Sequence, residues 1–155
     1  MFKKLFKSKK SMDVYAPAKG QCVDIETVSD AAFAAKAMGD GIAVLPIEGL
    51  VTAPCNGKIT MFFPTKHAFG IQADNGMEIL VHIGIDTVNA KGEGFTTLKK
   101  EGDIIQKGDT VVTFDLETLK KNYEMPVMMV VTNAQPFKKE HLNQHVTNEE
   151  IVFSI

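Results

Sequence analysis

The sequence contains no arginine, because all 17 of its basic residues are lysines. Proteins grip phosphate groups and guanine bases with the planar arginine fork, so this chain can offer anions only point charges and backbone N–H groups. The lysines are outnumbered by 19 aspartates and glutamates, which leaves a formal net charge of −2. This balance gives no electrostatic support for binding nucleic acid, and we expect no nucleic-acid partner.

Cysteines are scarce, and long apolar runs are missing from the sequence. Cys22 and Cys55 are the only two cysteines, and their spacing matches neither a metal site nor a disulfide framework, as expected in a reducing cytosol. No stretch approaches the roughly twenty apolar residues of a transmembrane helix. Residues 1–12 also lack the apolar core and cleavage site of a signal peptide. We therefore expect a cytoplasmic protein.

The first twelve residues, MFKKLFKSKKSM, differ in composition from the rest of the chain. Phe2, Leu5 and Phe6 can share one face of a helix that is surrounded by lysines. Two interpretations remain open: a disordered, solubilising tail, or a basic amphipathic arm that rests on the inner face of an anionic membrane. We assign residues 1–12 to this arm and residues 13–155 to one domain, which is long enough to bury a core.

Short apolar runs separated by turn residues make up this domain. Strands are expected at residues 14–16, 21–25, 67–73, 79–85, 104–105, 111–114, 127–131 and 151–155. Short helices are expected at 30–37 and 116–122, capped by Asp30 and Asp115. The pattern Ala-Pro-x-x-Gly occurs at 16–20 and again at 53–57, which suggests a duplicated hairpin. These features indicate an all-β fold, an antiparallel β-sandwich or flattened barrel with short helical turns.

Two histidines stand on neighbouring apolar runs. His67 and His82 flank Asp74-Asn75-Gly76, a sequence that favours a tight turn because Asn-Gly tolerates positive φ. In an antiparallel hairpin, residues equidistant from the turn lie opposite each other, so the two imidazoles should lie side by side. Histidine titrates near neutrality and can act as a base, a donor or a nucleophile. The alternative is a pair of core histidines, each satisfied by a backbone carbonyl.

Several motifs in a fixed order resemble one known family. They include GDGIAVLP (39–46), APCNGKI (53–59), PTKHAFGI (64–71) and NGMEILVHIGIDTV (75–88). From about residue 13 to residue 155, the chain resembles the glucose-class enzyme IIA of the bacterial phosphoenolpyruvate-dependent sugar phosphotransferase system. The resemblance implies a compact all-β sandwich that acts as a phosphotransferase component. Such a protein accepts a phosphoryl group on one histidine and passes it on.

The resemblance also implies roles for individual residues. His82 matches the phosphoacceptor, and Gly84 matches the position whose backbone carbonyl accepts a hydrogen bond from the ring of that histidine. His67 matches a second histidine that stabilises the phosphoryl oxygens, and Thr65 matches the residue that orients it. The acidic positions that flank the family's active site match Asp40 and Asp86, which could pair with a partner's cation.

A phosphate-transfer partner must expel water from the shared phosphate, which an apolar surface around the histidines would favour. Five residues are candidates for this surface, and we expect at least two of them to be core residues: Phe63, Phe69, Ile42, Val44 and Ile85. The resemblance implies two partners, the histidine-containing phosphocarrier protein as donor and a sugar-specific enzyme IIB/IIC permease as acceptor.

Two alternative functions remain open. One is a regulatory protein-binding module that is switched by phosphorylation of His82. The other is a zinc hydrolase, since related sandwich folds host zinc peptidases. A hydrolase would need a third ligand near the pair, and the His-x-His signature is missing because Ile83 and Gly84 follow His82. We expect no cofactor, although zinc could bridge His67 and His82 adventitiously.

Overall fold

The computed structural model describes residues 12–155, so the predicted arm at residues 1–12 lies outside the described residues apart from Met12. All strand pairs within this part of the chain are antiparallel. The predicted antiparallel all-β fold with short helical turns is therefore confirmed. None of the helices in residues 12–155 is long and apolar enough to cross a membrane.

The largest sheet has eight strands in the order β13-β2-β3-β11-β7-β6-β5-β9. From edge to edge these are β13 (Gln144–Val146), β2 (Gly20–Asp24), β3 (Asp40–Pro46), β11 (Val127–Val131), β7 (Glu78–Ile83), β6 (Ala68–Ala73), β5 (Gly57–Phe62) and β9 (Ile104–Ile105). The edge strands β13 and β9 do not pair with each other. The sheet is thus an open layer of a sandwich rather than the wall of a closed barrel.

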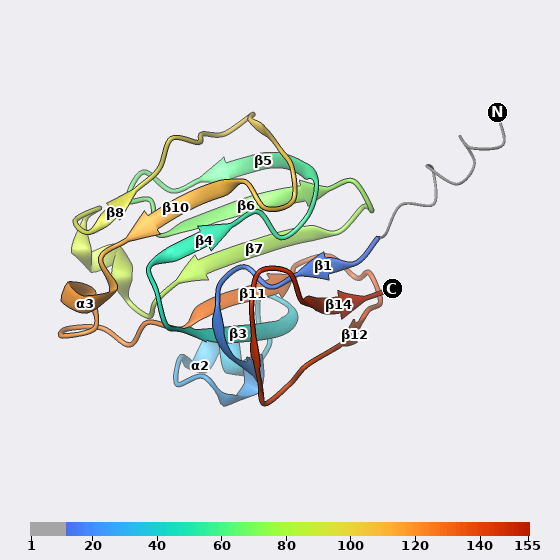
Figure 1. Ribbon diagram of the computed structural model, residues 1–155, viewed down its shortest axis with the longest axis horizontal. Helices are drawn as coiled ribbons and strands as arrows, with labels where there is room; N and C mark the ends of the chain where they lie inside the picture. The colour runs from blue at the N-terminus through green and yellow to red at the C-terminus, as the bar shows by residue number, and fades with distance from the viewer. Residues whose placement is uncertain (1–11) are drawn as a thin grey trace, which may run out of the picture.

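Two smaller sheets and four short helical segments complete the described fold (Figure 1). One sheet consists of β4 (Leu50–Thr52), β10 (Thr110–Phe114) and β8 (Phe95–Thr96), and the other of β1 (Val14–Tyr15), β14 (Ile151–Ser154) and β12 (Lys138–Lys139). The helical segments are η1 (Ile25–Thr27), α2 (Ala31–Ala34), η2 (Thr87–Ala90) and α3 (Leu116–Leu119). The side chains of Asp30 and Asp115 cap α2 and α3, as predicted.

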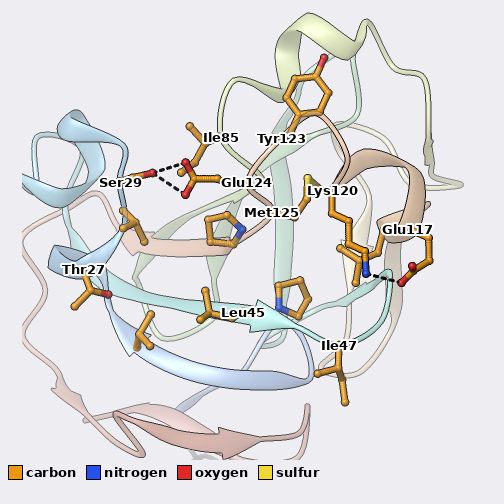
Figure 2. Close-up of a pocket in the computed structure, with 15 residues that line it drawn as sticks. Thr27, Ser29, Leu45, Ile47, Ile85, Glu117, Lys120, Tyr123, Glu124 and Met125 are labelled. Carbon is orange, nitrogen blue, oxygen red and sulfur yellow. Dashed lines mark hydrogen bonds and ion pairs between the residues drawn. The ribbon is translucent and has the colours of Figure 1, made fainter.

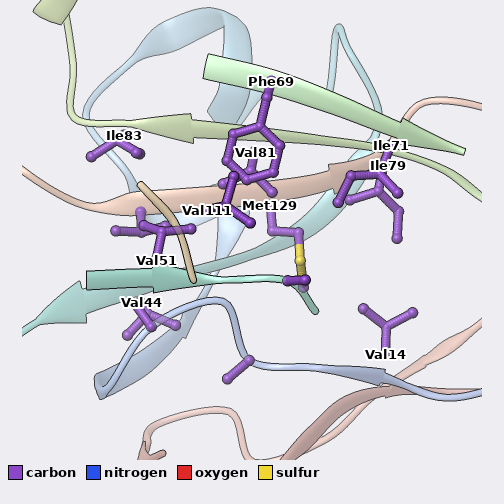
Figure 3. Close-up of a cluster of buried hydrophobic side chains, with 14 of the residues drawn as sticks. Val14, Val44, Val51, Phe69, Ile71, Ile79, Val81, Ile83, Val111 and Met129 are labelled. Carbon is purple, nitrogen blue, oxygen red and sulfur yellow. The ribbon is translucent and has the colours of Figure 1, made fainter. Parts of the chain in front are cut away.

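The main core lies between the eight-stranded sheet and the β4-β10-β8 sheet. Phe69 and Val81 from β6 and β7 meet Val51 from β4 and Val111 from β10 in this core (Figure 3). A second, smaller cluster lies on the outer face of the large sheet, where η1 and α2 cover the strands. Its buried members are Ile25, Phe33, Ala43, Met128 and Val130. The strand that carries His82 is therefore covered on both faces, as its apolar sequence indicates.

The two Ala-Pro-x-x-Gly segments occupy equivalent places in the fold. Gly20 begins β2 and Gly57 begins β5, and each strand pairs with the next one in the chain. The segments also contact each other reciprocally, because Tyr15 N–H donates to the Pro54 carbonyl at 2.8 Å and Thr52 N–H donates to the Pro17 carbonyl at 3.0 Å. Equivalent residues of the two segments therefore make the same hydrogen bond to the other segment, as expected for a duplicated hairpin.

Three residues predicted for the docking surface are core residues instead. Ile42, Val44 and Phe69 have no exposed surface. Successive side chains of a strand point to opposite faces, and these three lie on the inner face of their strands. They cannot contact a partner, so the docking-surface assignment was wrong for these three, whereas the expectation that at least two of the five are core residues is confirmed. Phe63 is 37% exposed and Ile85 is half-buried, so both remain candidates.

We predict that Phe69→Ala lowers the free energy of unfolding by about 3–5 kcal/mol, because it leaves a cavity in the main core. Phe63→Ala is the matched control, since the Phe63 ring is partly exposed, and it should cost less than about 1 kcal/mol. Urea denaturation of both variants measures the difference. Equal losses of stability would contradict the assignment of Phe69 to the core and Phe63 to the surface.

Candidate functional site

The rings of His67 and His82 meet at the open end of the β6–β7 hairpin. Their centroids lie 4.9 Å apart and the ring planes make an angle of 82°. The register differs by one residue from the simplest expectation, because Ala68 lies opposite His82 and the His67 carbonyl accepts from Ile83 N–H at 2.7 Å. His67 precedes the regular strand and follows Lys66, whose φ is 66°. Because His67 lies before β6, the alternation of side chains along that strand does not set the direction of its ring, which lies against His82.

His82 is held in one tautomer by the backbone of Gly84. Its Nδ1 lies 2.8 Å from the Gly84 carbonyl oxygen. A carbonyl can only accept, so Nδ1 carries the proton and Nε2 keeps a free lone pair in the neutral ring. Gly84 has φ 79°, and a Cβ there would lie 2.5 Å from Thr87 Cγ2 and 2.8 Å from Met125 Sδ. Only glycine fits this position without displacing its neighbours.

His67 is buried, with 1% of its surface exposed. Its Nδ1 lies 2.8 Å from the hydroxyl oxygen of Thr65. If the hydroxyl donates this hydrogen bond, the proton of the neutral imidazole lies on Nε2. The Phe63 ring approaches His67 edge-on, with centroids 5.2 Å apart. Thr65 and Phe63, which lie in the short turn before His67, therefore both contact its ring.

Both imidazoles favour the neutral form. Burial lowers the pKa of His67 to about 4, and the neighbouring His82 adds to this shift. Burial also lowers the pKa of His82, although the Gly84 hydrogen bond and the charges of Asp30 and Asp86 oppose this effect. At neutral pH the pair thus carries two N–H donors and two ring nitrogens with lone pairs.

The acidic residues near His82 are Asp30 and Asp86, as their effect on its pKa shows. Asp30 caps α2 by accepting from Ala32 N–H at 3.0 Å and Phe33 N–H at 3.1 Å. The Phe33 ring in turn lies 5.2 Å from the ring of His82. The sequence identified Asp30 only as a helix cap and did not reveal that its charge acts on the histidine.

Asp40 lies farther along the sheet from His82, and its predicted role toward a partner's cation stays a prediction. It lies opposite Val131, whereas His82 lies opposite Met128, three residues away on β11. Asp40 and His82 are thus separated by about 10 Å along the strands and by about 10 Å across the sheet. The Asp40 carboxylate accepts from Lys139 Nζ at 2.5 Å. Burial raises the pKa of Asp40, but the hydrogen bond and charge of Lys139 outweigh it and lower the pKa overall.

A groove of about 810 Å³ borders the site beyond Ile85 (Figure 2). Leu45 and Ile47 form one side, and the segment that leads from α3 into β11 forms the other. The Ser29 hydroxyl bridges the groove by donating to the carboxylate of Glu124 at 2.9 and 3.0 Å. The groove includes Ile85 but neither histidine, so it adjoins the pair without enclosing it.

A zinc hydrolase would need three protein ligands around one ion. Within residues 12–155, no group of three or more His, Cys, Asp and Glu side chains is arranged to hold a metal ion. The two histidines are therefore a two-residue site in the described part of the chain.

The pKa of His67 predicts a pH-dependent stability. The folded value is about 4, below the unfolded value of about 6.5. The folded protein therefore binds fewer protons between these pH values, and this residue's contribution lowers the free energy of unfolding by up to about 3 kcal/mol as pH falls from 7 to 4. His67→Gln should remove this contribution. Urea denaturation of both proteins at several pH values tests it, and parallel pH profiles would contradict it.

Comparisons with known proteins identify the family of this chain. Residues 12–137 match the family model described as phosphoenolpyruvate-dependent sugar phosphotransferase system, EIIA 1. A glucose-specific EIIA component from Halalkalibacterium halodurans is 51% identical and is aligned over 100% of this chain and 98% of its own length. One from Staphylococcus epidermidis is 44% identical over 92% of this chain and 89% of its own.

The solved structures include a similar fold. Glucose permease IIA from Mycoplasma capricolum superimposes with a TM-score of 0.84 and 35% identity, over 93% of this chain and 95% of its own. These similarities favour a phosphocarrier over the regulatory module and the zinc hydrolase. The chain belongs to the EIIA 1 family of the phosphoenolpyruvate-dependent sugar phosphotransferase system.

Proposed function

We propose that this protein carries a phosphoryl group on Nε2 of His82 and transfers it within a glucose phosphotransferase system. The observation that carries the proposal is the hydrogen bond from His82 Nδ1 to the Gly84 carbonyl. It leaves the lone pair of Nε2 free to attack phosphorus. The names of the relatives support glucose as the sugar, since they are described as glucose-specific components.

The transfer is an in-line exchange between two nitrogen atoms. The phosphorus–nitrogen bond to the donor histidine breaks, its electron pair returns to that nitrogen, and a new bond forms from phosphorus to His82 Nε2. The transition state is loose, with charge spread over three equatorial oxygens, so the protein mainly positions and stabilises. His67 supplies an Nε2–H donor for those oxygens when the Thr65 hydroxyl donates to its Nδ1.

The surroundings of the pair suit a protein partner. Phe63 and Val88 are 37% and 49% exposed, and the half-buried Ile85 adds apolar surface. The carboxylates of Asp30 and Asp86 can form ion pairs with a cation of the partner. Because this chain has no arginine, an arginine in the shared site would come from that partner. The donor is the histidine-containing phosphocarrier protein and the acceptor is a sugar-specific enzyme IIB, and both would meet this protein in the cytoplasm.

Intact-mass spectrometry after incubation with phosphoenolpyruvate, enzyme I and the phosphocarrier protein tests the proposal. Wild type and His67→Gln should each gain one acid-labile phosphoryl group, because glutamine keeps an N–H donor. His82→Gln should gain none. His67→Ala should accept the group about 100-fold more slowly, as expected when a transition-state donor is lost. A wild-type protein that stays unmodified beside an active donor would refute the proposal.

Asp30→Asn and Asp40→Asn form a matched pair. Asparagine still caps a helix, so Asp30→Asn removes only the charge near His82. We expect transfer from the phosphocarrier to slow by about 3- to 10-fold at low salt and by less at high salt. Asp40→Asn should slow transfer less than Asp30→Asn, because Lys139 already neutralises the Asp40 carboxylate, and it should cost about 1 kcal/mol of stability through the Lys139 pair. Transfer-rate assays measure the first effect and urea denaturation measures the second. Transfer that is slower in Asp40→Asn than in Asp30→Asn would contradict the prediction.

A further inference from the structure

Thr87 is a buried polar residue that the proposed mechanism does not use. Its side chain has no exposed surface. Its hydroxyl donates to the Ile83 carbonyl at 2.5 Å, which ties the first residue of η2 back to the last residue of β7. The residues between them, from Gly84 to Asp86, carry the carbonyl that holds His82 and a carboxylate that acts on it.

Two consecutive peptide planes in this segment are held at both ends. The Ile83–Gly84 plane is fixed by Thr87 at its carbonyl and by the Pro126 carbonyl, which accepts from Gly84 N–H at 2.8 Å. The Gly84–Ile85 plane is fixed by His82 at its carbonyl and by the Glu124 carbonyl, which accepts from Ile85 N–H at 2.9 Å. Figure 2 shows Ile85 beside Glu124 at the end of the groove.

Because a trans peptide unit is planar, its N–H and C=O point in opposite directions. The bond from Ile85 N–H to Glu124 thus turns the Gly84 carbonyl away from β11 and toward His82. Gly84 joins the two planes, and glycine itself gives little resistance to rotation about φ and ψ. The direction of the carbonyl therefore depends on the bonds that hold the planes on either side.

We propose that Thr87 is a positioning residue for phosphoryl transfer, whose hydroxyl fixes the Ile83–Gly84 plane and so keeps the Gly84 carbonyl on His82 Nδ1. Pro126 and Glu124 contribute to this arrangement with main-chain atoms, whereas Thr87 contributes with a side chain that can be exchanged. The inference rests on the proposed function, because it explains how Nε2 of His82 is kept as the reactive nitrogen.

The packing around Thr87 suggests the variants. Thr87 Cγ2 lies against Gly84, since a Cβ on that glycine would come within 2.5 Å of it. Thr87→Val keeps this shape and removes the hydroxyl, whereas Thr87→Ser keeps the hydroxyl and removes the methyl group. Thr52→Val is the matched control, because Thr52 is also buried and its hydroxyl accepts from Asn148 Nδ2 at 2.6 Å, in a contact that does not involve the histidines.

The first readout is the tautomer of His82, from its ring ¹⁵N chemical shifts in the unphosphorylated protein. Wild type, Thr87→Ser and Thr52→Val should show the Nδ1–H form, and Thr87→Val should show a mixture that includes Nε2–H. The second readout is the rate of phosphorylation by the phosphocarrier protein. It should fall about 10- to 100-fold in Thr87→Val, as for other supporting residues that orient a reactive histidine, and stay within about threefold in Thr87→Ser.

A wild-type tautomer and rate in folded Thr87→Val would overturn the inference, as would an equal loss of rate in Thr52→Val. If Thr87→Val does not fold, Thr87→Cys takes its place, because a thiol is a weak donor and should give a partial tautomer shift. Identical tautomers in Thr87→Cys and Thr87→Ser would then overturn it. Failure of wild type to be phosphorylated refutes the proposed function instead, and the tautomer measurement still decides whether Thr87 positions Gly84.

Discussion

The alternation of side chains along β7 determines both the core and the site. Ile79, Val81 and Ile83 point inward and are buried in the main core, so His82 must point to the outer face. A shift of one residue would bury His82 in the main core and expose the core residues. The outer face at this level is itself covered by α2, whose Phe33 packs against the His82 ring. The same apolar packing that stabilises the strand thus keeps the imidazole partly out of water.

Burial and nearby charge act on His82 in opposite directions, and burial prevails. Asp30 and Asp86 favour the charged ring, yet the pKa is lowered overall. An imidazole nitrogen is nucleophilic only in the neutral ring. The carboxylates near His82 are anions, so they would not hold a phosphoryl group in place. Since the chain has no arginine, it can offer the phosphate only lysine charges and backbone N–H groups, and a planar arginine fork would have to come from a partner. Such an arrangement suits a carrier, which has to release what it accepts.

The sequence predicted the elements that local chemistry determines. The turn at Asp74-Asn75-Gly76 and the caps Asp30 and Asp115 are present because each uses its own neighbours. Predictions that required tertiary information fared worse. Ile42, Val44 and Phe69 are buried because they belong to the alternating set of side chains that faces the second sheet. The sequence does not say which of the two alternating sets of each strand this is. The sequence also does not say that Asp40 pairs with Lys139, or that the cap of α2 places the charge of Asp30 where it acts on His82. The pairing of polar strands such as β12 is likewise set by the strands they meet.

Both connections that flank the histidine pair contain a residue in the left-handed region. Lys66, just before His67, has φ 66°, and Asp86, two residues after Gly84, has φ 62°. Such a conformation costs roughly 1–2 kcal/mol for a residue other than glycine, so the surrounding structure must hold it. At Asp86 the holding contacts are those of Gly84, Ile85 and Thr87 to β7 and to the segment before β11. A loose transition state gains little from new covalent bonding and depends on groups that are already in place. The strained connections are therefore consistent with a site whose geometry is fixed before a partner arrives.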